Sequence, residues 1–425
     1  MTGALLLALQ IVAIDSLPVV SLAEALDRSA RLDPNYVTAL GRVQTAEWGR
    51  RAALVTFLVP AISLQTDWTR ASEPFFNIGT GSLATTSVSA RIDARIDLFT
   101  GGQKIFGYRQ ADALLDAARA GELAARFATA LQTESDYYAV LAEEELTRTA
   151  RARVARAQEQ FEVARARVRT GAAVQTDSLQ LSLEVSRALV TLLREESALR
   201  VARLQLGRRV GVTGPVAAAP LDTALAASLP FPLAEAVRRA LAQGPEYRQA
   251  RATERAAQAA FNGRKSAYLP RATLSAQSIA FDDRFFPEAL KRNLLTVTVS
   301  LPLWDNGNRE IALTQARANR DVARALRTDF ERAAQRDVGA AYDAYETARA
   351  AAALATDAVV VARENFRIQQ TRYRSGATTI LDLLDAQVNL SDAETALVQA
   401  RYVTRLALAA LEAILGERLF NRNLE

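Results

Sequence analysis

Two halves of this amino-acid sequence follow the same plan, and this duplication constrains the fold more than any other feature. Leu22-Ala23-Glu24-Ala25 recurs as Leu233-Ala234-Glu235-Ala236 at an offset of 211 residues, and Phe57 recurs as Tyr268. Further matches follow at an offset of 205: Phe99 with Trp304, Gly102 with Gly307, Gly171 with Gly376 and Asp177 with Asp382. Such internal repeats predict repeated structural units, so each element inferred in one half should reappear in the other.

Each half contains two segments in which apolar and polar residues alternate, as they do in β-strands. The segments span residues 61–70, 86–99, 271–282 and 294–304. In the second segment, Val88, Ala90 and Ile92 would share one face, and Ser89 and Arg91 the other. Two hairpins of a water-soluble sheet would alternate in the same way. We favour membrane-spanning strands, because strands of about 10 to 14 residues can cross a bilayer at a tilt.

Aromatic residues gather near both ends of these segments. One group comprises Trp68, Phe75, Phe76, Phe281, Phe285 and Phe286, and the other comprises Phe57, Phe99, Tyr268 and Trp304. Aromatic girdles of membrane β-proteins lie at the two membrane–water interfaces, which is the position that these groups would occupy. We therefore expect the strands to cross an outer membrane, with residues 71–85 and 283–292 outside the cell.

Long helices occupy most of the remaining chain. Proline-free stretches at about 104–168 and 309–374 predict helices, which at 1.5 Å per residue would be roughly 95–100 Å long. Each should turn back at a glycine, Gly171 or Gly376, and continue as a returning helix. The resulting division has an export signal or its remnant (1–20), a first repeat (21–206, turn at 169–177), a linker (207–232), a second repeat (233–416, turn at 372–385) and a C-terminal tail (417–425).

Composition removes several classes of function. The chain contains no His and no Cys, which excludes disulfides, thiolate nucleophiles and most zinc or copper sites. We expect neither a cofactor nor a metal site, and no catalytic residues. The net charge is +5, but Arg alternates with Asp and Glu along the predicted helices, as on solvated helix faces. No nucleic-acid motif accompanies these charges, so we expect no nucleic-acid partner.

The turn of the second half carries the most specific motif, Arg372-Tyr373-Arg374-Ser375-Gly376 followed by Leu381-Asp382-Leu383-Leu384-Asp385-Ala386-Gln387. With the duplication and the strand pairs, it resembles the TolC family of outer-membrane efflux proteins over residues of about 21–416. The resemblance implies a mixed α and β membrane fold. In this fold three subunits would form a twelve-stranded outer-membrane β-barrel, to which each subunit contributes four strands. The β-barrel would continue as a long periplasmic α-helical barrel.

This resemblance also implies partners and a location. The protein would be a homotrimer in the outer membrane of a Gram-negative bacterium, in contact with outer-membrane lipid and extending into the periplasm. It would work with a periplasmic adaptor (a membrane fusion protein) and an inner-membrane pump of the RND, ABC or MFS type. The function implied is the exit duct of a tripartite efflux or type I secretion system. The transported substrate and the individual pump and adaptor are not encoded in any motif of this chain.

Residues at the turns would form the gate and the periplasmic entrance. By position relative to the glycines, the resemblance assigns Asp177, Tyr373, Asp382 and Asp385 to the closing network and a ring of carboxylates. The best-known member of the family has an Arg two residues after the glycine, where this chain has Thr378. Arg372 and Arg374 are the candidates to replace it. Independently, Asp177 and Asp382 could be simple caps of the returning helices.

Two alternatives were weighed. A periplasmic adaptor or coiled-coil scaffold would also contain a long helical hairpin, but adaptors carry Gly-rich β domains around a single hairpin, and this chain has two. An enzyme acting through carboxylates would need paired acids in a cleft or a phosphate-binding loop. Gly101-Gly102 is better interpreted as a joint between a strand and a helix.

Overall fold

The computed structural model describes residues 17–77, 81–221, 227–283 and 290–420. The chain forms two units, which are described separately. The first contains residues 1–38, 123–244 and 334–425, and the second contains residues 39–122 and 245–333. The export signal predicted at 1–20 lies almost entirely outside the described residues, as do Phe285 and Phe286.

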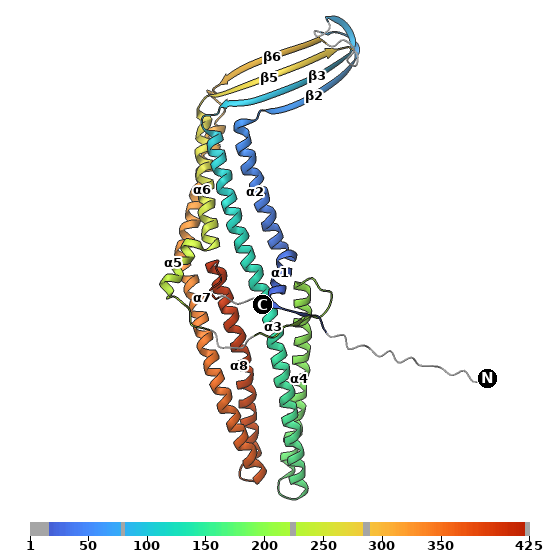
Figure 1. The fold of residues 1–425 in the computed structure, drawn as a ribbon, viewed down its shortest axis with the longest axis vertical. Coiled ribbons are helices and arrows are strands. Elements are labelled where there is room, and N and C mark those ends of the chain that lie inside the picture. The colour runs from blue at the N-terminus through green and yellow to red at the C-terminus, as the bar shows by residue number, and fades with distance from the viewer. Residues whose placement is uncertain (1–16, 78–80, 222–226, 284–289, 421–425) are drawn as a thin grey trace, which may run out of the picture. The chain divides into compact units, whose positions relative to one another are not determined.

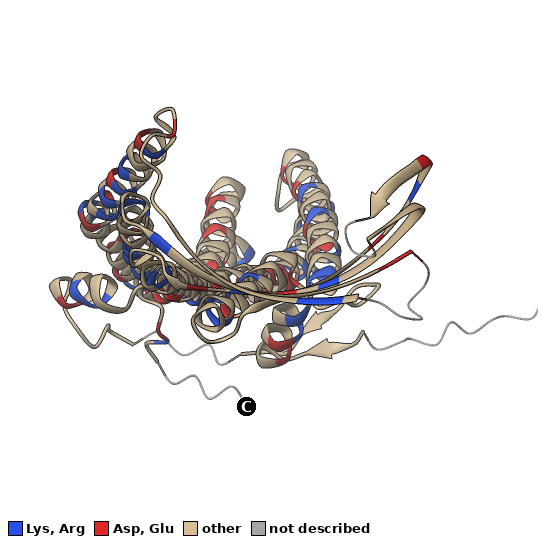
Figure 2. Ribbon diagram, turned by 90° about the horizontal axis from the view of Figure 1, so that it is seen from above, with Lys and Arg blue, Asp and Glu red and all other residues tan. Residues whose placement is uncertain are grey.

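The first unit is built on two long helical hairpins (Figure 1). One joins α3 (Gln103–Arg169) to α4 (Gln175–Arg209), and the other joins α7 (Asn308–Ser375) to α8 (Ile380–Leu415). The helices α3 and α7 begin and end within about one residue of the predicted bounds, and each is followed by the predicted returning helix. Alanine-rich sequences without proline sustain such lengths. Figure 2 shows that acidic and basic residues are interspersed along the helices, with neither sign confined to one of them.

Short elements close the middle of the first unit. They are α1 (Leu22–Leu32), α5 (Leu233–Gln243) and the parallel pair of β1 (Val19–Val20) with β4 (Ala217–Ala218). The segment predicted as a linker therefore contributes a strand. Tyr137 of α3 is fully buried beside this pair, where its hydroxyl donates to the carbonyl of Ala219 at 2.7 Å. Burial raises the pKa of Tyr137 to about 12, so it stays protonated at any physiological pH.

The second unit carries a four-stranded antiparallel sheet in the order β2-β3-β5-β6. Its strands are β2 (Ala61–Asn77), β3 (Ser82–Phe99), β5 (Arg271–Asp282) and β6 (Leu290–Ser300). The helices of this unit are α2 (Pro34–Leu58, from residue 39), the first part of α3, α6 (Pro245–Lys265), and the first part of α7. The 3-10 turn Ser266–Tyr268 links α6 to β5. Within the described residues, no helix has an apolar stretch long enough to span a membrane.

The predicted strand ends require correction at three places. β2 continues to Asn77 instead of ending at residue 70, and β3 begins at Ser82 instead of 86. The alternation is broken there because the register shifts between Arg70 and Phe75, around Pro74, which an edge strand tolerates at a bulge. β6 spans Leu290–Ser300 instead of 294–304. Its early end agrees with Pro302, which has no N–H to donate to the ladder.

Because of these corrections, the aromatic residues predicted at one end of the strands do not all lie at one level of the sheet. Trp68 pairs with Val88, and Phe281 pairs with the adjacent Ser89, so these two aromatic residues lie at nearly the same level of the sheet. Phe75 and Phe76 instead lie further along the hairpin, in the part of β2 that we had predicted as a loop.

We expect Leu206→Ala to destabilise the first unit strongly. Leu206 is fully buried in a core that includes Tyr137 and Val216, and removing such a side chain costs about 2–5 kcal/mol. The melting temperature of the purified protein should fall clearly below that of the wild type. Leu204→Ala is the control, because Leu204 is half exposed. Equal melting temperatures for the two variants would contradict this assignment of the core.

Candidate functional site

The two helix-hairpin turns of the first unit have the same backbone geometry. Gly171 and Gly376 adopt φ angles of +75° and +79°, which L-residues rarely adopt. In each turn the residue after the glycine donates its N–H to a carbonyl five residues earlier: Ala172 to Arg167, and Ala377 to Arg372, both at 2.8 Å. The glycine ends a long helix by the αL route common at helix C-termini. The duplication therefore extends to the hydrogen bonds of the turns.

Tyr373 lies in the last turn of α7 and is buried, with 2 % of its surface exposed. It packs in a core with Leu181 of α4 and with Ile380 and Leu383 of α8. Burial raises the pKa of Tyr373, and the nearby carboxylate of Asp177 raises it further. The structure thus brings together Tyr373 and Asp177, one from each hairpin. The Tyr373 hydroxyl itself makes no hydrogen bond of normal geometry to any described residue.

Arg167 joins the two turns, and the sequence interpretation had not selected it. Its guanidinium donates to the carbonyl of Tyr373 and, at 3.1 Å, to that of Ala172. Its Cζ also lies 4.8 Å from the centre of the Tyr373 ring, a cation–π contact. The duplication could have identified this residue, because Arg167 and Arg372 differ by the 205-residue offset.

The arginines that were the candidates to replace the family's gating Arg have other partners. Arg372 donates to the carbonyl of Ala377 at 3.3 Å, and Arg374 forms an ion pair with Glu159 of α3. Among the described residues, no hydrogen bond or ion pair joins the side chain of either arginine to Asp177 or to the side chain of Tyr373. Thr378 donates to Asp382 at 2.8 Å. The cation beside Tyr373 is therefore Arg167.

The three acidic residues of the turns differ in their surroundings. Asp382 and Thr379 form a reciprocal capping box at the start of α8, and hydrogen bonds from Thr379 and Thr378 lower the pKa of Asp382. Asp385 is exposed and accepts a hydrogen bond from Asn389 at 3.1 Å. Asp177 is in the first turn of α4, whose N-cap, Val174, provides no side-chain bond. Capping thus accounts for the position of Asp382 but not for that of Asp385.

A buried polar network lies further from the turns, between the two hairpins. Glu184 of α4 has a side chain that is 6 % exposed, and it pairs with Arg153 of α3 at 2.7 Å. Arg153 also donates to Ser391 of α8 at 3.3 Å, and the buried amide of Gln387 donates to Glu184 at 3.4 Å. The Arg153–Glu184 ion pair lies within the first hairpin, and the hydrogen bonds to Ser391 and from Gln387 connect it to the second. The ion pair of Arg156 with Glu394 of α8, at 3.1 Å, also joins the two hairpins.

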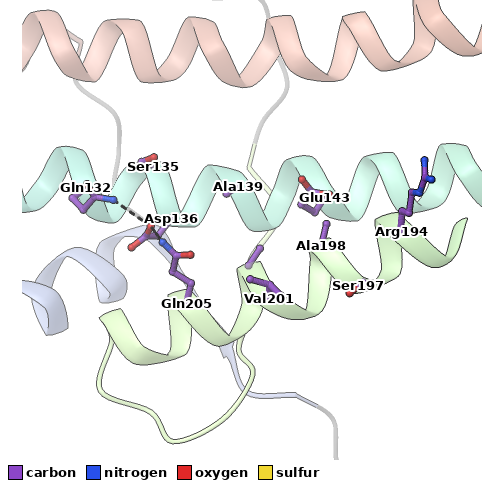
Figure 3. Close-up of a pocket in the computed structure, with 11 residues that line it drawn as sticks. Gln132, Ser135, Asp136, Ala139, Glu143, Arg194, Ser197, Ala198, Val201 and Gln205 are labelled. Carbon is purple, nitrogen blue, oxygen red and sulfur yellow. Dashed lines mark hydrogen bonds between the residues drawn. The ribbon is translucent and has the colours of Figure 1, made fainter. Parts of the chain in front are cut away.

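A groove of about 600 Å³ runs between α3 and α4 (Figure 3). Asp136 accepts hydrogen bonds there from Gln132 and Gln205, and it pairs with Arg209 at 2.8 Å. Glu143 also lines the groove, and burial followed by the charge of Glu195 raises its pKa. The groove therefore contains one paired carboxylate, Asp136, and one carboxyl group with a raised pKa, Glu143. No group of acidic residues suited to hold a metal ion occurs in the described parts of the chain.

The sheet of the second unit has one apolar and one polar face. Leu64 and Ile92 form a pair on the apolar face, and Ile96, Leu274 and Val297 form a row across three strands. On the polar face, Arg91 donates to Gln65 at 3.0 Å, and Gln277 donates to Asp93 at 2.6 Å. Apolar side chains such as Leu64 and Val297 are 70 % and 62 % exposed. This face therefore requires an apolar environment.

We expect Arg167→Gln to loosen the contact between the two turns. The substitution removes the cation–π contact and the charged donor to the Tyr373 carbonyl, so amide hydrogens in the last turn of α7 should exchange faster. Hydrogen–deuterium exchange measured by mass spectrometry checks this. Arg372→Gln is the matched control, because Arg372 holds only its own turn. Unchanged exchange at residues 370–377 in Arg167→Gln would contradict the role given to Arg167.

Comparisons with known proteins agree with this fold. The sequence profile of the outer membrane efflux protein family matches residues 42–212 and 236–417. Protein CyaE of Bordetella pertussis is 33 % identical over 187 residues, which are 43 % of this chain. The match spans only 39 % of CyaE.

Solved structures share the fold over nearly the whole chain. The outer membrane protein VceC of Vibrio cholerae superposes with a TM-score of 0.76 at 19 % identity, covering 94 % of this chain and 97 % of VceC. The CmeC outer membrane channel of Campylobacter jejuni superposes with a TM-score of 0.79 at 14 % identity. The match covers 94 % of this chain and 86 % of CmeC. At these identities the likeness concerns the fold. The family match, however, covers well over half of the chain, and we conclude that this protein belongs to the outer membrane efflux protein family, a family of transport proteins and not of enzymes.

Proposed function

We propose that this protein is the outer-membrane channel of a tripartite efflux or type I secretion system. The observation that carries the proposal is the sheet, which exposes large apolar side chains on three of its strands, β2, β3 and β6. β3 spans 18 residues, and strands of about 9–11 residues suffice to cross a bilayer. Family membership supports the outer membrane as the location and efflux as the activity. It disfavours the alternative of a periplasmic adaptor.

The sheet also supports self-association. Its outer strands, β2 and β6, each have one unpaired edge, and an edge exposed to lipid leaves backbone groups unsatisfied at several kcal/mol each. Pairing β2 of one copy with β6 of the next removes every edge. With four strands per copy, three copies give a twelve-stranded barrel. The mass of the detergent-extracted complex should be that of a trimer, and a stable monomer that retains its strands would rule this assembly out.

The hairpins of the first unit give independent support for association. Leu179 and Leu193 of α4 are 62 % and 65 % exposed in the single chain, and Leu354 and Val361 of α7 are 71 % and 69 % exposed. Exposed apolar residues at this density are typical of surfaces that a partner covers. In a ring of three copies they would pack against neighbouring hairpins, forming the wall of a periplasmic tunnel. The turns would then surround its entrance, where an adaptor and an inner-membrane pump would dock.

Single-cysteine labelling tests the location. The native chain has no Cys, so one introduced thiol gives an unambiguous signal. A membrane-impermeant reagent should label Ser82→Cys and Asp283→Cys in intact cells, because these positions lie at the hairpin ends of the sheet. Ala325→Cys and Ser186→Cys, on exposed helical positions, should react only after the outer membrane is permeabilised. The opposite pattern is incompatible with the proposed topology.

Opening of the entrance should depend on the contacts between the hairpins. We expect Tyr373→Phe combined with Asp177→Ala to favour the open state, because the variant removes the tyrosine hydroxyl and the carboxylate that face each other there. Conductance in planar bilayers should rise above the low resting value of the wild type. Glu364→Ala is a control, since Glu364 is exposed and pairs with Arg367 of its own helix. Unchanged conductance in the double variant would show that these two groups do not hold the gate.

Ion selectivity tests the carboxylate ring. Three-fold symmetry would bring together three copies of Asp382 and of Asp385, an arrangement that attracts cations. Asp382→Asn with Asp385→Asn removes both charges while leaving an amide that can still cap α8, so the preference for cations should weaken. Thr379→Ala is the matched control, because it removes the cap but leaves both charges. Equal selectivity in the neutralised variant and the wild type would limit Asp382 and Asp385 to a structural role.

A further inference from the structure

Three cationic side chains lie around one buried aromatic ring of the second unit, and two of them form no ion pair within the described residues. The ring belongs to Phe261 of α6, which is 4 % exposed. Lys265 Nζ and Arg320 Cζ each lie 4.5 Å from its centre, and Arg317 Cζ lies 6.0 Å from it. Arg320 pairs with its neighbour Asp321 at 2.6 Å. Lys265 and Arg317 are exposed, and no ion pair is formed by either within the described residues.

The first half of the chain provides an internal comparison. At the offsets of the duplication, Leu54 corresponds to Lys265, and Asp112 corresponds to Arg317. Asp112 forms an ion pair with Arg50 at 2.9 Å, and nearby Arg119 pairs with Glu47 at 3.2 Å. Arg50 and Arg119 are therefore paired in the first copy, whereas the exposed Arg51 and Arg109 lie over Trp48 and Phe106 without an ion pair among the described residues. The second copy has replaced an apolar residue by a cation and a carboxylate by another cation.

These cations lie close to the sheet along the chain. Lys265 is the last residue of α6, and β5 begins at Arg271. Arg317 is in the first turns of α7, which follows β6. Exposed apolar residues lie between the cations and the strands in chain order: Leu269 before β5, and Trp304 and Ile311 after β6. Where a protein leaves a bilayer and meets the lipid headgroups, its apolar residues are followed by Trp and then by Lys or Arg.

We propose that Lys265 and Arg317 bind the phosphate of a phospholipid headgroup at the membrane surface. The inference rests on the proposed function, which puts the sheet in a membrane. Two unpaired cations attract a phosphate diester, and the arginine can donate two parallel hydrogen bonds to its oxygens. The Phe261 ring holds both cationic groups by cation–π attraction. The site would anchor the second copy to the headgroups of the leaflet adjoining the helices.

Titration of the detergent-solubilised protein with phosphatidylglycerol, followed by native mass spectrometry, tests the site. The variant Lys265→Gln with Arg317→Gln should bind the lipid about 25-fold more weakly than the wild type, given that each cation near a membrane surface adds about a fivefold factor. Arg50→Gln with Arg119→Gln removes the same number of charges from the first copy and should bind like the wild type. The charge-conserving exchange Lys265→Arg with Arg317→Lys should also retain binding.

Each remaining outcome contradicts the proposal. Equal lipid affinity in the neutralised variant and the wild type would overturn it. Equal loss in the first-copy control would show that only net charge matters, and competition by inorganic phosphate as effective as by the lipid would exclude a headgroup site. The single variants Lys265→Gln and Arg317→Gln replace the double variant if that one does not assemble. A failure of the proposed function would be detected separately, because the wild-type protein would then be absent from the outer-membrane fraction.

Discussion

The edges of the four-stranded sheet are the constraint on which the rest of the structure depends. An antiparallel sheet with one apolar face can enter lipid, but β2 and β6 each keep one row of backbone N–H and C=O groups unpaired. Water can satisfy such groups, whereas hydrocarbon cannot. A single copy of this chain is therefore incomplete as a membrane protein. The helical hairpins have a similar requirement, because α4 and α7 expose apolar residues that another surface would have to cover.

The two copies have kept the same backbone but have diverged in their charges. Gly171 and Gly376 turn the chain in the same conformation, and Arg167 and Arg372 each donate to the carbonyl of the residue after the glycine. Only Arg167 also reaches the other hairpin, where it contacts Tyr373. The same divergence occurs near the sheet, where the balanced pair Arg50–Asp112 of the first copy has no equivalent at Arg317.

Much of this architecture could be predicted from the sequence, because its signals are local and repeated. Period-two alternation and the absence of proline located the four strands and the four long helices, and the glycines located both turns. The strand ends were less accurate, since the bulge around Pro74 interrupts the alternation while pairing continues beyond it. Tyr373 and Asp177 were selected by resemblance, and the structure does bring them together. Their part in a gate is a proposal that the geometry supports.

Side-chain contacts between distant segments could not be predicted. Arg153, Glu184 and Gln387 come from three different helices, and no spacing within the sequence indicates that they meet. The duplication pairs Arg167 with Arg372, but nothing in the sequence indicates that Arg167 contacts Tyr373 of the other hairpin. The pairing of cations with Phe261 likewise depends on the packing of α6 against α7. Such contacts are set by which helix faces meet, and that is decided by the packing of the whole unit.

The contacts near the turns suggest why motion could be confined to that end of the hairpins. There the hairpins share a small apolar core and the contacts of Arg167, and a cation–π contact and a charge-assisted hydrogen bond are each worth only about 1–3 kcal/mol. Further along, the partly buried ion pair of Arg156 with Glu394 joins α3 of one hairpin to α8 of the other at 3.1 Å. The hydrogen bonds of Arg153 to Ser391 and of Gln387 to Glu184 also cross between the hairpins. Separating the hairpins beyond the turns therefore requires these additional polar contacts to break, so we expect opening to begin at the turns.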